Sequence, residues 1–272
     1  MNVLNSPYNP VFSFYYIAID TEAGVTNNQF EKFVREKGVF IPCYPGWRWT
    51  LLRGIRGERA GQYLMLYEIE SAEHRNRYIN AAGQRTEAAL AFWERHEDAL
   101  DVIKEWRAFG TFSQLPTLFT DYRLLAVNAK SDVPAGPRYQ ERPGAEPIAR
   151  VIGIHNLALK EGVEPAQFEQ FIANNHNRII DYPGWKFHLL KGERGNRLDQ
   201  YAVMMEIESM AALNIFYPEP DIATDTAATF AKEHLDTKQM YEEWKRLASF
   251  SGSPQIYTDY IAVAESCCHD TK

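Results

Sequence analysis

The chain repeats itself at one constant offset. The tetrapeptide Tyr-Pro-Gly-Trp at residues 44–47 recurs at residues 182–185, an offset of 138 positions (183 minus 45). The same offset relates Glu-Ile-Glu-Ser at 68–71 to 206–209 and Thr-Asp-Tyr at 120–122 to 258–260. No gap is needed from about residue 12 to about residue 127. One module has therefore been duplicated within one chain, with equal element lengths in both copies.

Composition limits the class of protein and its partners. The chain has 272 residues, 45% of them hydrophobic, so each copy of roughly 115 residues can build its own core. The net charge of −7 argues against a nucleic-acid partner. No apolar run reaches 18 residues, and residues 1–10 lack the pattern of a signal peptide. We expect a cytoplasmic protein with a small-molecule substrate and no nucleic-acid or membrane partner, either a monomer with an internal pseudo-dimer or a homodimer.

The three cysteines predict no disulfide framework. Cys267, Cys268 and His269 offer the atoms of a metal site, but they lie in a polar terminal tail without a second cysteine pair. The other interpretation is a reduced, frayed tail. Together with Cys43 they predict reduced thiols, which are typical of the cytoplasm, and we expect no metal.

A linker separates the two copies. Residues 128–147 contain four prolines and two glycines among polar residues. This composition is extended and semi-rigid, and it does not continue a strand or helix. We place the first module at residues 1–128, the linker at 129–147, the second module at 148–265 and a polar tail at 266–272.

Both copies show the same order of elements. Residues 12–20 and 151–159 are rich in β-branched and aromatic residues, which predicts an opening strand in each copy. Thr26 precedes an apolar stripe with helical spacing that recurs in the second copy. We expect second strands at 47–53 and 185–191, third strands at 62–70 and 200–208, long helical stretches at 86–109 and 225–250, and fourth strands at 117–127 and 256–264.

The element order is β-α-β-β-α-β in each copy. This is the ferredoxin-like unit, a four-stranded antiparallel sheet with helices on one face. The open face of each sheet needs a partner, and two equal copies provide it. The predicted fold class is α+β, with two tandem ferredoxin-like modules whose sheets pack into one intramolecular α/β barrel.

Short motifs in the second copy support a family resemblance. Phe168 and Phe171 precede His176, then come Pro-Gly-Trp at 183–185 and Glu-x-Glu-Ser at 206–209. With the element order, this pattern resembles the dimeric α/β-barrel superfamily, and particularly its ethyl tert-butyl ether degradation and stress-responsive branch. The resemblance implies a cavity between sheet and helices of each module. It does not name the reaction, because the superfamily includes cofactor-free monooxygenases, isomerases, cyclases, decarboxylases, dehydratases and haem enzymes.

Histidines differ between the copies. His155, His176 and His188 stand where the first copy has Ile17, Gly38 and Thr50. Histidine works as an acid or base near neutral pH, so the second copy is the candidate active one.

Each of these histidines also has a structural interpretation. His155 is in phase with Leu157 on a strand, which fits a core histidine as well as a catalytic one. His176 either acts in the site or caps the first helix. His188 either reaches the site or lies exposed on an edge strand. His234, matched by His96, is expected to be structural. We expect no cofactor, and a haem with His234 as its ligand is the weaker alternative.

Other paired residues add candidates. Glu206 and Glu68 either act in catalysis or pair with Lys186 and Arg48 on the neighbouring strand. Tyr260 is a candidate partner donor, although a buried Asp-Tyr hydrogen bond explains its recurrence equally well. Aromatic residues either line a pocket for a flat ligand or fill the core, and the candidates are Trp49, Tyr16, Tyr67, Trp93 and Trp185.

Absent motifs narrow the function. The chain has no GxGxxG, P-loop, HExxH, CxxC or GxSxG motif, which argues against nucleotide cofactors. The predicted function is a cofactor-independent acid–base enzyme of lyase, isomerase, decarboxylase or cyclase type, acting on a small apolar, aromatic or polyketide-like molecule. His176 or His155 would be the base. The alternatives are a cofactor-free monooxygenase and a non-catalytic ligand-binding or stress-response barrel.

Overall fold

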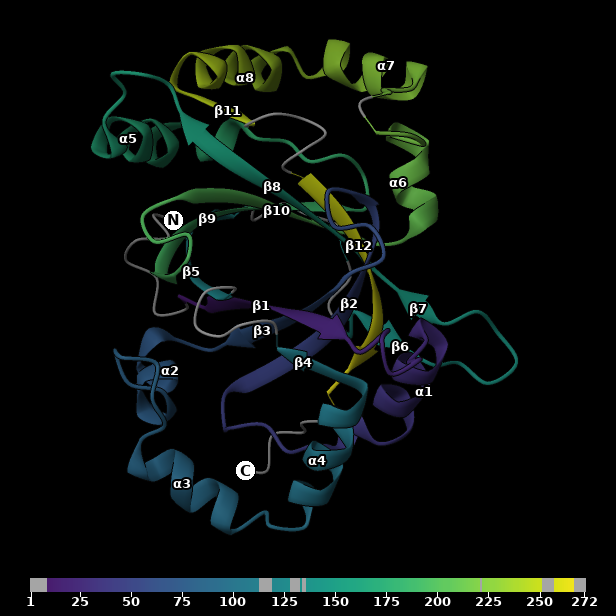
Figure 1. Cartoon of the computed structure of the whole chain (residues 1–272). Coiled ribbons are helices and arrows are strands. Elements are labelled where there is room, and N and C mark those ends of the chain that lie inside the picture. Colours follow the sequence, from purple (N-terminus) through teal and green to yellow (C-terminus); the bar gives the residue numbers. More distant parts are fainter. Residues whose placement is uncertain are drawn as a thin grey trace.

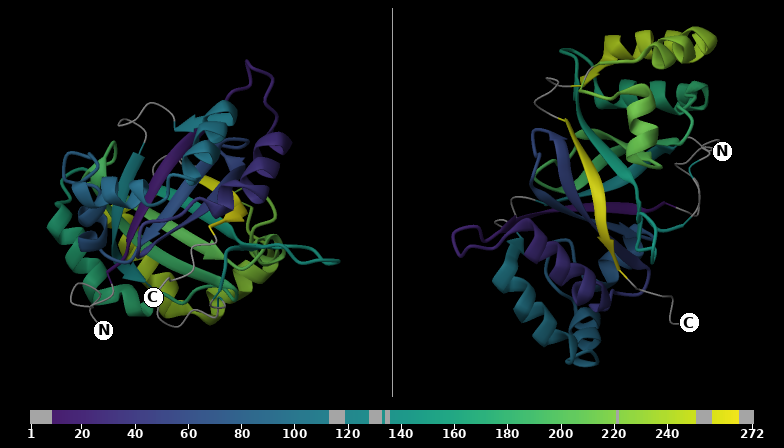
Figure 2. Two further views of the ribbon diagram at one scale, coloured as in Figure 1. Left: turned by 90° about the horizontal axis from the view of Figure 1, so that it is seen from below. Right: turned by 90° about the vertical axis from the view of Figure 1, so that its right-hand side faces the viewer.

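The computed structural model describes residues 9–112, 119–127, 133, 136–220, 222–250 and 257–266. Eight antiparallel strands close into a barrel in the order β10-β9-β5-β1-β3-β2-β12-β8, and β8 pairs back with β10 (Figure 1). The helices of the first module cover one side of the barrel and those of the second module cover the opposite side (Figures 1 and 2). The predicted fold class is confirmed.

Among the described residues, the first module supplies four barrel strands and four helices. Its strands are β1 (Val11–Ile19), β2 (Trp47–Gly57), β3 (Tyr63–Ile69) and β5 (Phe119–Val127). Its helices are α1 (Asn27–Glu36), α2 (Ala72–Tyr78), α3 (Glu87–Glu94) and α4 (Ala99–Phe109), and its short elements are η2 (Gly38–Phe40) and β4 (Gly110–Phe112).

The second module repeats this set. Its strands are β8 (Val151–Leu159), β9 (Trp185–Gly195), β10 (Tyr201–Ile207) and β12 (Tyr257–Glu265). Its helices are α5 (Pro165–Asn175), α6 (Met210–Phe216), α7 (Asp225–Glu233) and α8 (Leu235–Leu247), and its short elements are η3 (His176–Arg178) and β11 (Ala248–Phe250).

Two seams join the modules. β5 pairs with β9 and β12 pairs with β2, and each seam has register shifts at equivalent positions. Gly57 and Gly195 lie at these seams with φ of 92° and 88°. A Cβ at residue 57 would stand 2.1 Å from the Tyr257 carbonyl oxygen, so the close approach of the two strands requires glycine.

Side chains alternate between the barrel interior and the helix-facing surfaces. The interior is packed with apolar residues from both modules, so the barrel is a shared core. Its buried members are Phe12, Phe14, Leu52, Leu64, Leu66, Tyr122, Leu124, Ile152, Ile154, Leu190, Ala202, Met204, Tyr260 and Ala262. Separate clusters fill the layers between the sheet and the helices of each module.

Several elements differ from the sequence prediction. Each long helical stretch is two helices, α3 with α4 and α7 with α8, and His234 ends α7. The short helices α2 and α6 were not predicted, although Ser71 and Ser209 cap them through their side chains. The linker also contains a short hairpin of β6 (Tyr139–Gln140) and β7 (Ile148–Ala149). The domain boundaries themselves stay a prediction.

The cysteine prediction is wrong for Cys43, which is disulfide-bonded. The other two cysteines, together with His269, lie outside the described residues. Within the described residues no group of three or more His, Cys, Asp or Glu side chains could hold a metal ion. The helices in the same part of the chain are all too short or too polar to cross a membrane.

Candidate functional site

The helix-facing surface of β8 differs sharply between the two modules. Ile152 and Ile154 point into the barrel, so the alternating residues Gly153 and His155 face the helices of the second module. Their equivalents at the offset of 138 are Tyr15 and Ile17. A bulky phenol and an aliphatic side chain are thus replaced by a glycine and an imidazole.

His155 leans over Gly153. The ideal Cβ position on Gly153 is 3.7 Å from His155 Nε2 and 2.9 Å from Asp259 Oδ1. The imidazole and the Asp259 carboxylate therefore approach the same point above the glycine. The His155 ring also stacks on Tyr257, with centroids 5.0 Å apart and planes 14° apart. This brings a base, a carboxyl group and a phenol together on one face of the sheet.

The first module shows what fills the equivalent space when glycine is absent. Tyr15 stacks on Phe119 with centroids 5.3 Å apart and planes 13° apart, nearly the geometry of His155 on Tyr257. Tyr67 packs against Tyr15 in an edge-to-face arrangement, with ring centroids 5.5 Å apart. In the second module the imidazole takes the place of the phenol ring, which is possible because residue 153 carries no side chain.

Asp259 is a buried carboxyl group with few partners. Its equivalent, Asp121, accepts a hydrogen bond from Ser13 at 2.6 Å and forms an ion pair with Arg75 at 3.5 Å. The second module has Val151 and Leu213 at those two positions.

The pKa of Asp259 reflects the absence of partners equivalent to Ser13 and Arg75. Of the described residues, Arg56 forms an ion pair with Asp259, at 3.3 Å. Burial raises the pKa of Asp259 to about 6 although the charge of Arg56 lowers it. This carboxyl group can therefore exchange a proton close to neutral pH.

Further polar side chains of this layer are specific to the second module. Tyr217, Tyr241 and Asp181 stand where the first module has Ile79, Ile103 and Cys43. Burial raises the pKa of Tyr241, and the neighbouring Asp181 carboxylate and Tyr217 phenol raise it further, so the three groups lie near one another. The hydroxyl of Tyr217 also contacts that of Tyr182 at 3.3 Å.

Met205 connects these groups to the strand surface. It packs, as Tyr241 does, against one buried cluster of the layer and, as Tyr217 does, against another. It replaces Tyr67, a larger and stiffer side chain that closes the first module's layer. The second module therefore combines smaller strand residues with more polar ones in the space between sheet and helices.

His188 lies on the other side of the sheet. It is 5% exposed and faces the barrel interior, where it meets the edge of Phe12 at 5.7 Å. The expected exposed position on an edge strand is wrong, because β9 is paired on both sides by β5 and β10. Burial lowers the pKa of His188 to about 4, against the opposing charge of Glu206 at 3.9 Å. Its imidazole is therefore neutral and separated from His155 by the sheet.

Glu206 belongs to a buried ion-pair network at one end of the barrel. Arg138 from the linker lies 2.7 Å from Glu68 and 3.4 Å from Glu206, so it bridges equivalent glutamates of the two modules. Arg150 adds a contact of 2.5 Å to Glu206. Burial alone would raise the pKa of Glu206, but the charges of Arg138 and Arg150 hold it at about 2. The predicted pairing of Glu68 with Arg48 is present at 2.7 Å.

The predicted pairing of Glu206 with Lys186 is replaced by the two arginines. Lys186 is the cross-strand neighbour of Glu206, but the ion pairs of this carboxylate are with Arg138 and Arg150. Its low pKa and these short contacts describe a structural anion rather than a proton acceptor.

Tyr260 and Tyr16 also lie inside the barrel. Tyr260 is 1% exposed within the interior cluster, and Tyr16 packs against that cluster with the guanidinium of Arg59 3.8 Å from its ring centroid. Burial raises the pKa of both phenols. Since both point away from the helix-facing layer, neither meets His155.

His176 and His234 end helices. The imidazole Nδ1 of His176 lies 3.2 Å from the Ile172 carbonyl oxygen, and that of His234 lies 2.9 Å from the Phe230 carbonyl oxygen. His234 also stacks on Phe230 at 4.0 Å, as His96 does on Phe92 at 4.3 Å. The structural interpretation of His234 fits this arrangement.

The aromatic candidates do not line one pocket. Trp49 and Tyr67 belong to the core layer of the first module, Trp93 donates from Nε1 to the Tyr44 hydroxyl at 2.8 Å, and Trp185 donates to the Ala212 carbonyl at 3.4 Å. With Tyr16 inside the barrel, these five side chains lie in four separate environments.

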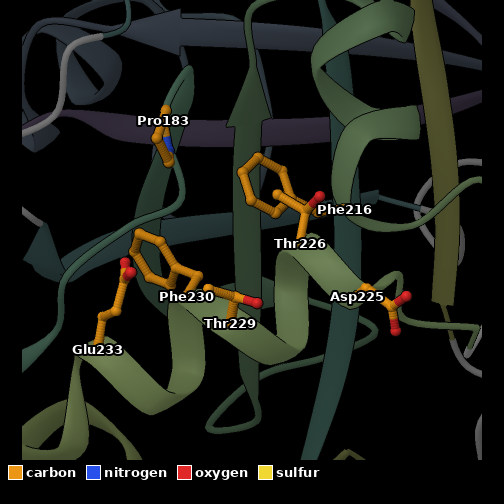
Figure 3. Close-up of a pocket in the computed structure, with 7 residues that line it drawn as sticks. All are labelled: Pro183, Phe216, Asp225, Thr226, Thr229, Phe230 and Glu233. Atoms are coloured by element: carbon orange, nitrogen blue, oxygen red, sulfur yellow. The ribbon is translucent and has the colours of Figure 1, made fainter.

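A surface pocket of about 360 Å³ lies on the second module, beside α6 and α7 (Figure 3). Tyr182 packs against two aromatic side chains that line it, with its ring centroid 4.2 Å from that of Phe216 and 4.8 Å from that of Phe230. The Tyr182 hydroxyl then reaches Tyr217, which connects this pocket to the polar layer. The lining residues are Pro183, Phe216, Asp225, Thr226, Thr229, Phe230 and Glu233.

Sequence reasoning therefore found one member of the cluster, His155, and missed Gly153, Tyr257 and Asp259. A glycine in the interior of a strand was an available signal, because it marks a close approach or an open space. Comparison of every position at the offset of 138, rather than of histidines alone, would have found the tyrosines as well.

Neither a protein-family model nor a curated protein sequence matches this chain. Among solved structures, an anthrone oxidase-like protein aligns over 96% of this chain and 93% of its own, with 16% identity and a TM-score of 0.49. A protein assigned as a monooxygenase from Lactobacillus acidophilus NCFM aligns over 95% of this chain and 96% of its own, with 8% identity and a TM-score of 0.45. These likenesses do not identify a reaction or the ethyl tert-butyl ether branch.

Proposed function

We propose that the second module carries an acid–base site for a small apolar, aromatic or polyketide-like molecule, bound between its sheet and its helices. His155 is the base and Asp259 is its carboxyl partner. The observation that carries the proposal is the exchange of Tyr15 and Ile17 for Gly153 and His155, which removes a space-filling phenol and adds a titratable group at the same place.

The chemistry is a proton transfer without electron transfer. The His155 imidazole accepts the proton of a phenol hydroxyl or of a carbon next to a carbonyl, which leaves the substrate anion and an imidazolium. The carboxylate of Asp259 stabilises that imidazolium. Burial raises the pKa of Tyr241, so its hydroxyl can donate a hydrogen bond to the oxyanion, and the Tyr217 hydroxyl is a second donor. Return of the proton to another carbon completes an isomerisation. In a lyase step the anion expels a leaving group that takes the proton, and in a decarboxylase step a carboxylate leaves as CO2 and its carbon takes the proton. In a cyclase step the carbanion adds to a carbonyl carbon, and the carbonyl oxygen takes the proton.

A cofactor-free monooxygenase begins with the same deprotonation, after which the substrate anion reacts with oxygen. Oxygen uptake during turnover separates the two reactions. A non-catalytic barrel would bind the same kind of molecule without converting it.

The test is a screen of phenols, enols and 1,3-dicarbonyl compounds for turnover, followed by two single variants. His155→Gln is expected to lower kcat/KM by about 10²–10⁴-fold, the usual contribution of a general base. His176→Gln is the matched control, because that imidazole lies at the end of α5 against the Ile172 carbonyl oxygen, and the variant is expected to retain activity. Equal activities of wild type and His155→Gln would overturn the acid–base assignment.

A further inference from the structure

Arg56 crosses from one module to the other. It lies on β2 of the first module, whose pairing with β12 closes one seam of the barrel. Its side chain is 12% exposed, and its Nε lies 3.3 Å from Asp259 Oδ2. Asp259, which belongs to the candidate site of the second module, therefore forms its ion pair with a residue of the first module.

The same guanidinium also holds a helix of the second module. Its Nη1 donates to the Tyr217 carbonyl oxygen at 2.9 Å, and its Nη2 donates to Asn214 Oδ1 at 3.2 Å. Three nitrogens of one planar group thus fix Asp259 and the end of α6 relative to each other. Tyr217 follows α6 directly, so this clamp also sets the position of its phenol.

The second module contains the matched arginine, Arg194 on β9, which crosses the other seam toward the first module. Arg194 donates to the Asn80 carbonyl oxygen at 3.0 Å and to Asn76 Oδ1 at 2.6 Å, which repeats the helix clamp. Asp121, however, also has Ser13 and Arg75 as partners. Asp259 lacks both equivalents, so its charge depends on Arg56 more than that of Asp121 depends on Arg194.

We propose that Arg56 is a positioning residue that the first module supplies to the acid–base site of the second. The proposal rests on the proposed function, and it makes that site incomplete without the first module. Arg56 orients the Asp259 carboxylate toward His155 and keeps it ionised over a wider pH range. In the described part of the chain, the charged or titratable groups that the contacts bring to Asp259 are Arg56 from β2, His155 from β8 and Tyr257 from its own strand.

The experiment is a ¹³C NMR titration of the Asp259 carboxyl carbon in the full chain, assigned with Asp259→Asn. Arg56→Gln is expected to raise the titration midpoint by about one pH unit, the usual effect of removing an opposite charge at this distance. Arg194→Gln removes the matched clamp and is expected to leave the Asp259 midpoint in place. A purely structural role would lower thermal stability in both variants and leave the midpoint unchanged in both.

An unchanged midpoint in Arg56→Gln, or equal shifts in both variants, would overturn the proposal. If Arg56→Gln does not fold, Arg56→Lys and Arg194→Lys replace the pair, because they keep the charge but lose the planar fork. A midpoint shift in Arg56→Lys alone would support the positioning role, and its absence would refute it. The titration needs no substrate, so its outcome is independent of the turnover test of His155→Gln.

Discussion

The Asp259 carboxylate lies directly over Gly153, with Oδ1 2.9 Å from the position that a Cβ would take. This contact links a strand-interior glycine to a buried carboxyl group that has a pKa of about 6. It also explains how His155 reaches the same place, because any side chain at residue 153 would occupy it.

The first prediction concerns this contact. Gly153→Ala is expected to displace the Asp259 carboxylate or the His155 ring, since a Cβ at 2.9 Å from an oxygen forces one of them to move. Overpacking of this kind destabilises by about 1–3 kcal/mol. Urea unfolding measures the cost, and the Asp259 titration shows the displacement. A variant with wild-type stability and midpoint would contradict the described packing.

The second prediction concerns Asp259 and pH. Its folded pKa of about 6 lies above its unfolded value of about 3.9, so ionisation costs the native state more than the unfolded state. Stability is therefore lost as the pH rises from about 4 to about 6. Asp259→Asn is expected to be more stable than wild type at pH 7.5, by up to about 3 kcal/mol, and to lose this advantage near pH 4. Urea unfolding of wild type and variant at both pH values measures the difference in unfolding free energy. A variant less stable than wild type at pH 7.5 would contradict the raised pKa.

The third prediction concerns His188 inside the barrel. Its folded pKa of about 4 lies below the ordinary value of 6.5, so the unfolded chain takes up a proton that the native state refuses. Its contribution to stability is complete above pH 6.5 and is lost as the pH falls toward 4, by roughly 3 kcal/mol. His188→Gln removes this titration. The stability difference between wild type and variant should therefore change across that range, and a constant difference would show that the imidazole is not buried as described.

The fourth prediction concerns Arg138, which lies between Glu68 and Glu206. Arg138→Gln leaves two buried carboxylates without their shared partner, and breaking a buried ion pair in this way costs about 3–5 kcal/mol. Arg142→Gln is the control, because Arg142 is an exposed residue of the same linker. Chemical unfolding of the two variants should differ by this amount. Equal stabilities would show that the linker does not hold the modules together.

The barrel could be predicted because the repeat fixed both the element order and the number of open sheet faces. Two sheets with one bare face each have few ways to bury them. The helix break at His234 and the short helix α6 were missed, because a Ser N-cap over seven residues is a weak local pattern. The linker hairpin depends on tertiary pairing, which composition does not report.

The site was only partly predictable for a different reason. Alternation along β8 and β9 places His155 and His188 relative to their own neighbours, but it does not say which face is the barrel interior. Which face becomes the barrel interior depends on how the strands of the other module pack against β8 and β9. The role of Asp259 depends on Val151 and Leu213, whose meaning appears only when they are compared with Ser13 and Arg75 in space.

The central claim is that the second module's layer is a site because it lacks the residues that fill the first. The most direct test is the double variant Gly153→Tyr and His155→Ile, which restores the first module's side chains at both positions. Turnover or binding of the best compound from the phenol and enol screen is measured for wild type and variant at matched stability. The account predicts loss of both in the variant. Full activity or binding in the variant would contradict it.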